Sequence, residues 1–292
     1  AVVIAMMMTG NMVVGILASG VFFFFLPAVM LLLEGYCEIF FVTTARNAWT
    51  SDGSPFMWGM KYLSPFSVYI TALDWKLDEI VKHVPELICS GFGVLALFFL
   101  GMQLYRIRPS ESAGKAMAFK RTMAPIRILL VLGCGLAGGL FFWAMQSRLR
   151  WGLFGTVVFT ILTHCIVEII YHFDFKKLFG RKLQLVLCLG AGVLVFLSFR
   201  HDWYGYDSYL PEADQVVSAS LELDIDSGWL NNRSVLQNDQ GEYELDYKPA
   251  YESIEEDMKL TDMDLVMPLV EEGRRSALLG RDERLGIVKA VP

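Results

Sequence analysis

Long apolar runs constrain this chain most, because each is long enough to cross a membrane as a helix. A bilayer core about 30 Å thick needs about 20 apolar residues per span. In a single apolar segment, only a helix can pair the backbone N–H and C=O groups within the hydrocarbon. Residues 2–43 contain only two charged side chains, so we expect two helices there, with a turn near Ser19 and Gly20. The expected spans are 2–20, 21–43, 86–105, 127–146, 151–171 and 183–199.

The charges divide the chain into two parts. Residues 1–199 hold 16 basic and 10 acidic side chains, whereas residues 200–292 hold 9 basic and 21 acidic ones. At 54% hydrophobic residues the chain is more apolar than a typical soluble domain. We therefore expect an all-α polytopic membrane protein with six transmembrane helices, followed by a small extracellular α+β domain. The acidic part argues against a nucleic-acid partner, which requires basic patches.

The distribution of Lys and Arg predicts the orientation, because basic residues concentrate in cytoplasmic loops. A basic linker at 106–127 and a second basic segment at 172–182 are separated by two spans, so they lie on the same side. Their basic residues are Arg106, Arg108, Lys115, Lys120, Arg121, Arg127, Lys176, Lys177, Arg181 and Lys182. We predict that this side is the cytoplasm. Residue 1, the region 44–85, the turn at Arg148 and Arg150, and the acidic domain are then expected outside.

Two regions between and after the spans have patterns of their own. At 71–84 the apolar spacing favours an interfacial or re-entrant helix, with an aromatic-anchored loop as the alternative. Apolar and polar residues alternate at 217–225 and again at 241–247, which predicts a pair of strands. At 260–280 the spacing predicts a helix that Pro268 kinks or splits.

Ionisable side chains within the expected spans are candidate functional residues by default. Glu34 and Glu38 share a helix face near the outer end of their span. They fit a polar face of a pathway, or simply a pair that meets water at the interface. His164, Glu168 and His172 form a second row with the same spacing. We favour a structural hydrogen-bonded pair within this row, near the cytoplasmic end, over a metal site.

Motifs for nucleotide or metal chemistry are missing from the sequence. It contains no P-loop, HExxH, GxSxG or zinc-cysteine pattern. The glycine-rich stretch GCGLAGG at 133–139 lies within an expected span and follows no strand, so it predicts close helix packing instead of a dinucleotide loop. We assign no catalytic, cofactor-binding or metal-binding residue to this chain.

Two motifs carry a resemblance to a known family, namely QLYRIRPSESAGKAMAF at 103–119 and FRHDWYGYDSYLPEADQV at 199–216. The segment 163–182 supports them. Together they resemble the permease subunits of Gram-positive bacterial ABC transporters that have a type-2 exporter-like core and an extracellular C-terminal domain. The resemblance implies a non-catalytic, multi-pass cell-membrane subunit that moves a lipid, peptide, antibiotic or envelope precursor. A separate ATPase subunit would supply ATP hydrolysis.

The resemblance also implies a division of the chain. Residues 1–105 would be the closing part of the permease core, with external helices at 44–85 and earlier spans ahead of residue 1. Residues 106–127 would be the cytoplasmic linker, 128–199 an additional three-helix bundle, and 200–292 the extracellular domain, complete or in part. The implied partners are the ATPase, a second permease subunit and the lipid bilayer. Contacts at the cytoplasmic face would come from Arg106, Arg108, Ser110, Glu111, Gly114, Lys115, Lys120 and Arg121.

Two other functional classes fit the same sequence. One is a membrane-anchored sensor or complex subunit whose extracellular domain binds a ligand. The other is an intramembrane enzyme that uses His164 and Glu168. Neither class requires a partner ATPase, which is the feature that distinguishes them from a permease.

Overall fold

The computed structural model describes residues 2–43, 84–109, 114–178, 180–212, 214, 216, 232–237, 243–248 and 259–284. They belong to two compact units, the first formed by residues 1–207 and 281–292 and the second by residues 208–280. Five helices in this part of the chain are long and apolar enough to cross a membrane. The protein is therefore a multi-pass membrane protein.

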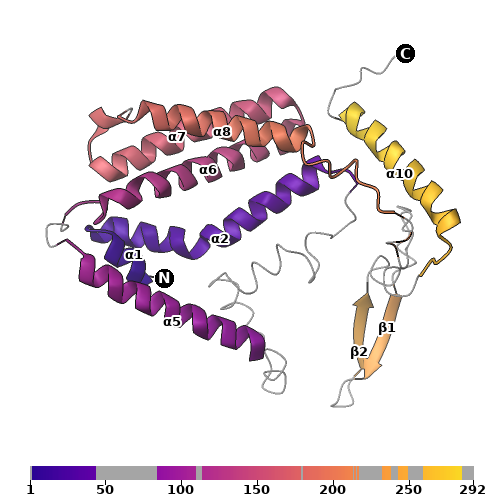
Figure 1. The fold of residues 1–292 in the computed structure, drawn as a ribbon, viewed down its shortest axis with the longest axis horizontal. Helices are drawn as coiled ribbons and strands as arrows, with labels where there is room; N and C mark the ends of the chain where they lie inside the picture. Colours follow the sequence, from indigo (N-terminus) through magenta and orange to yellow (C-terminus); the bar gives the residue numbers. More distant parts are fainter. Residues whose placement is uncertain are drawn as a thin grey trace. The chain divides into compact units, whose positions relative to one another are not determined.

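Three antiparallel helices form the bundle of the first unit: α6 (Met123–Gln146), α7 (Leu149–His172) and α8 (Lys182–Arg200). They pack side by side, as Figure 1 shows. A left-handed residue, Ser147 with φ 48°, ends α6, and Phe173 with φ 51° ends α7. Short connections therefore reverse the chain, which makes neighbouring helices antiparallel. The spans expected at 127–146, 151–171 and 183–199 are confirmed to within a few residues.

Glycines allow α6 and α7 to approach closely. A Cβ on Gly135 would collide with the side chain of Thr160, and one on Gly139 with that of Thr156. A Cβ on Gly155 would collide with the backbone of Gly138. The prediction that GCGLAGG packs helices together is confirmed, because small residues are what permit such backbone contact in a membrane.

Helix α2 (Met12–Phe40) is a single continuous helix, so the turn expected near Ser19 and Gly20 is wrong. Ser19 Oγ donates to the carbonyl of Gly15, 2.7 Å away, which satisfies the hydroxyl inside the helix. The break lies earlier, where Asn11 caps α2 by accepting from the N–H of Val13. A capping Asn after Gly10 was the signal for this start.

Helix α1 (Val2–Met8) is too short to be a span, since seven residues extend only about 10 Å. It packs against α2 and against α5 (Val84–Ile107), which matches the span expected at 86–105. The run at 2–43 therefore supplies one long helix and one short one instead of two spans. The external helices expected at 44–85 lie outside the described residues, except where α5 begins.

An aromatic cluster closes one end of the first unit. Tyr36 and Phe40 of α2, with Phe41 directly after it, pack with Trp143 of α6 and with Phe196 and Phe199 of α8. The backbone N–H and hydroxyl of Thr43 both donate to Asp207. Residues 200–207 are thereby held against the end of α2. We call this the far end, and the opposite end, with residues 8–11 and 114–122, the linker end.

The second unit contains both strands and a helix. Strand β1 (Asn232–Gln237) pairs antiparallel with β2 (Tyr243–Lys248), with Val235 opposite Leu245. The strand predicted at 241–247 thus exists but pairs with β1, while residues 217–225 lie outside the described residues. Helix α10 (Met263–Arg284) runs through Pro268 without interruption. Pro268 lies in its second turn, where the missing N–H costs one helical hydrogen bond.

The revised helix count changes the predicted orientation of the N-terminal segment. Since α2 is one span, its start at Asn11 lies at the linker end, and its C-terminal end lies at the far end. We predict that a cysteine placed at the exposed Lys115 reacts with an impermeant thiol reagent only from the cytoplasmic side. A cysteine at Arg148 should react only from outside, in a variant whose five native cysteines are replaced. Labelling of Lys115→Cys in intact cells would contradict this orientation.

Candidate functional site

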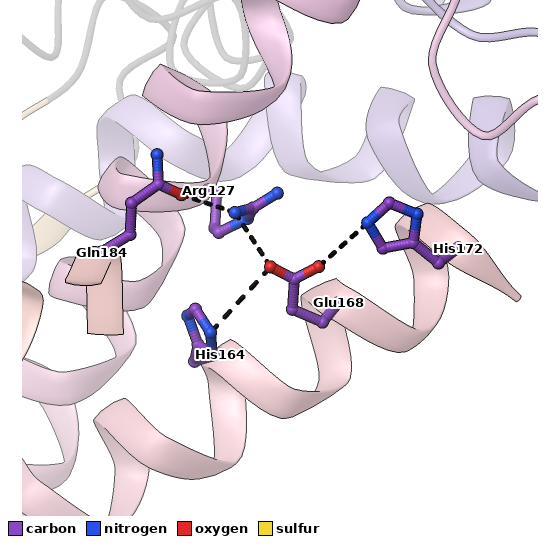
Figure 2. Close-up of polar contacts among 5 residues, drawn as sticks. All are labelled: Arg127, His164, Glu168, His172 and Gln184. Atoms are coloured by element: carbon purple, nitrogen blue, oxygen red, sulfur yellow. Dashed lines mark hydrogen bonds and ion pairs between the residues drawn. The ribbon is translucent and has the colours of Figure 1, made fainter. Parts of the chain in front are cut away.

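A buried ionic cluster joins α6, α7 and α8 near the linker end (Figure 2). Arg127 of α6 faces Glu168 of α7, with its NH1 atom 2.9 Å from Glu168 Oε1. The same nitrogen donates a 2.5 Å hydrogen bond to Oε1 of Gln184 on α8. Arg127 therefore connects all three helices of the bundle through one guanidinium group.

Two histidines flank Glu168 on its own helix, as Figure 2 shows. His172 Nε2 lies 3.3 Å from Glu168 Oε2, and His164 Nε2 lies 4.0 Å from Oε1. At 4.0 Å, His164 is beyond hydrogen-bond reach of Glu168, so the closest pair within the row is His172 with Glu168. The nearest partner of the carboxylate is Arg127 of α6.

The cluster is almost entirely removed from solvent. Arg127 is 1% exposed, and both His164 and Glu168 are 0% exposed. The ring of Tyr171 lies under the guanidinium of Arg127, with 5.2 Å between the ring centroid and Cζ. Charged groups at such depth persist only when paired, so this pair holds the bundle in one arrangement.

Several polar atoms of the cluster have spare hydrogen-bonding capacity. Among the described residues, Arg127 Nε and NH2, both ring nitrogens of His164, both carboxylate oxygens of Glu168 and the hydroxyl of Tyr171 lack a hydrogen-bond partner. The Arg127–Glu168 contact is thus ionic without being a well-aligned hydrogen bond. Such a cluster can carry charge and exchange protons, but it presents no exposed nucleophile.

The row of His164, Glu168 and His172 on α7 is too long to hold one metal ion. Within the described ranges, no group of three or more His, Cys, Asp or Glu side chains is placed to hold a metal ion. The row His164, Glu168 and His172 extends about 12 Å along the helix, which is too far for one ion to contact all three.

The linker forms a second feature, which we call the linker tie: residues 8–10 hydrogen-bonded to residues 114–118. Gly114 donates to the carbonyl of Gly10, Gly10 donates to that of Lys115, and Ala118 donates to that of Met8. Arg108 NH2 also donates to the carbonyl of Thr9, at 2.9 Å. Gly114 has φ 81°, which an L side chain adopts only with strain.

The predicted linker residues are distributed around this tie. Arg108 is half-buried within it, whereas four basic side chains are exposed: Arg106, Lys115, Lys120 and Arg121. Ser110 and Glu111 lie outside the described residues. The sequence indicated the positive charge of this segment, but not that it is hydrogen-bonded to the junction between α1 and α2.

Glu34 and Glu38 are not part of the cluster. They lie in the last turns of α2, at the far end, and Glu38 is exposed while Glu34 is half-buried. The two groups of intramembrane ionisable residues are thus at opposite ends of the helices. Arg127 was the functional residue that sequence reasoning missed, because it was counted with the linker. Because burying the unpaired charge of Glu168 within a span would be strongly destabilising, the sequence already indicated that a cationic partner lies nearby.

Comparison with protein-family models, curated proteins and solved structures gives no match for this chain.

Proposed function

We propose that this chain is the non-catalytic permease subunit of an ABC transporter. A separate ATPase subunit would supply the energy, and a second permease subunit would complete the pathway. The linker tie is the observation that carries the proposal. It joins the segment after α5 and before α6 to the junction between α1 and α2.

Four helices therefore meet at one hydrogen-bonded segment. A partner that moves residues 114–118 would also move the junction between α1 and α2, because backbone hydrogen bonds connect the two segments. The exposed basic side chains around the tie are suited to an acidic surface on an ATPase, since charge complementarity favours such docking. The ATPase would thereby drive the helices between inward-open and outward-open arrangements.

The residues of the tie belong to the same motif that carries the family resemblance. Gly114 and Lys115 lie within YRIRPSESAGKA, and Gly114 occupies the position whose φ favours glycine. A hydrogen-bonded turn of this kind gives a physical reason for an Ala-Gly pair there. In this proposal the chain lies in the cell membrane with its C-terminal unit outside.

Substitution at Gly114 provides a test of coupling. Gly114→Ala forces a side chain into a left-handed conformation, at a cost of about 1–2 kcal/mol. We expect it to lower the substrate-stimulated ATPase activity of the full-length protein with its partner ATPase in proteoliposomes. Gly20→Ala is the matched control, because open space surrounds Gly20 within α2.

Two measurements distinguish the role as a permease subunit from the role of the tie in coupling it to the ATPase. Co-purification of a P-loop ATPase with the full-length protein supports the role, and its absence would contradict it. If Gly114→Ala and Gly20→Ala stimulate the ATPase equally, the tie does not transmit the movement.

A further inference from the structure

An apolar cavity of about 540 Å³ lies beside the ionic cluster within the first unit. Helix α2 provides one wall through Val14, Leu17, Val21 and Leu26. The opposite wall comes from α6 and α7, and residues of α1, α5 and the linker complete it. Nearly all its lining side chains are aliphatic, aromatic or thioether groups, so the cavity suits a hydrocarbon chain.

The cavity follows α2 along the membrane normal. From Val14 to Leu26 the helix rises about 18 Å, which matches roughly half the thickness of a bilayer core. Thr9, Met117 and Tyr171 line its linker end, whereas Phe25 and Leu26 line the deep end. An acyl chain that enters from one leaflet and reaches the midplane has this length and direction.

Polar groups line the cavity only at its linker end. Thr9 and Tyr171 are the lining residues with polar side chains, and the hydroxyl of Thr9 already donates to the carbonyl of Ala5. Tyr171 is 9% exposed, and no hydrogen-bond partner for its hydroxyl exists among the described residues.

Positive charge surrounds the same end. Met117 of the lining follows Lys115 and precedes Lys120 and Arg121, all exposed. Arg108 donates to the carbonyl of Thr9, a lining residue. The linker 106–127 contains six basic residues and one acidic residue. Such a segment attracts anionic headgroups at the cytoplasmic surface.

We propose that this cavity binds one acyl chain of an anionic phospholipid of the cytoplasmic leaflet. Its headgroup phosphate lies against Lys115, Lys120 and Arg121, which are exposed at the linker end. The site is independent of the transport role, because it requires only the first unit and a membrane.

The cavity is tested by filling it. The full-length protein is purified in detergent, incubated with phosphatidylglycerol or phosphatidylcholine, and its bound lipid is counted by native mass spectrometry. Leu17→Trp, which fills the cavity, should lower phosphatidylglycerol retention by about tenfold, since loss of a buried chain removes several CH₂ contacts. Leu31→Trp is the matched control, because Leu31 is on the same helix, similarly exposed at 58% against 53%, and outside the lining.

The headgroup assignment is tested by charge removal at exposed positions. Replacing Lys115, Lys120 and Arg121 together with Gln should abolish the preference for phosphatidylglycerol, by about tenfold or more. Replacing Arg148 and Arg150 with Gln should leave it unchanged.

Three results would overturn the proposal. Equal retention of phosphatidylcholine and phosphatidylglycerol by the unmodified protein would exclude a specific anionic headgroup. Retention unchanged by Leu17→Trp would show that the acyl chain binds elsewhere, or that a protein segment fills the cavity. A preference that survives loss of the three linker charges would place the headgroup at another site.

Discussion

Replacing Glu168 with alanine is expected to lower the free energy of unfolding by about 3–5 kcal/mol, since it leaves a buried guanidinium without its counter-ion. Arg127 is 1% exposed, and Glu168 is its nearest carboxylate at 2.9 Å. His164 and His172 cannot substitute for Glu168, because neither carries negative charge. Denaturant unfolding of the detergent-solubilised protein measures the change.

A double variant separates the cost of the unpaired charge from the cost of lost packing. Replacing both Arg127 and Glu168 with Met removes both charges and keeps apolar volume, so stability should return to near that of the unmodified protein. If the double variant is as unstable as Glu168→Ala, packing within the cluster and not the unpaired charge explains the loss. Glu272→Ala is the exposed control, since its contact with Arg275 is 4.0 Å long and both side chains are about three-quarters exposed.

Replacing Gly155 with alanine should have the second largest effect on stability. Its Cβ would collide with the carbonyl group of Gly138, which is backbone in a packed helix and cannot rotate away. Overpacking of this kind costs about 1–3 kcal/mol, or more where backbone must shift. We expect a lower Tm and a smaller yield of folded protein in detergent.

The control is a glycine with open space around it. Gly190→Ala on α8 meets nothing within 4 Å, so it should leave Tm unchanged or raise it slightly through better helix propensity. Should Gly155→Ala and Gly190→Ala have the same Tm, the close approach of α6 and α7 would be contradicted.

Hydropathy predicted the helices of the bundle because charged or polar residues interrupt the apolar runs between them. Arg148 lies between α6 and α7, Arg150 is in the first turn of α7, and the basic segment before Lys182 separates α7 from α8. The same reasoning failed at residues 2–43, where no charge marks the boundary. There the length of the run suggested two spans, while the cap at Asn11 decided the actual start of α2.

The partner of Glu168 could not be read from the sequence. Arg127 is 41 positions away and belongs by charge count to the linker, yet its side chain is directed into the bundle. Which residue faces a given carboxylate depends on how two helices are rotated about their axes. Neither hydropathy nor the spacing of residues within one helix predicts how two helices are rotated relative to each other.

The amino-acid sequence by itself determined that this is a multi-pass helical membrane protein, and that glycines bring α6 and α7 together. These follow from local properties, namely the length of apolar runs and the size of side chains. Only the tertiary structure decided which faces meet: Arg127 with Glu168, residues 8–10 with 114–118, and α2 with the bundle around an apolar cavity. The physical reason is that hydrocarbon accepts any apolar face, so helix contacts are selected by packing and polar pairing between distant residues.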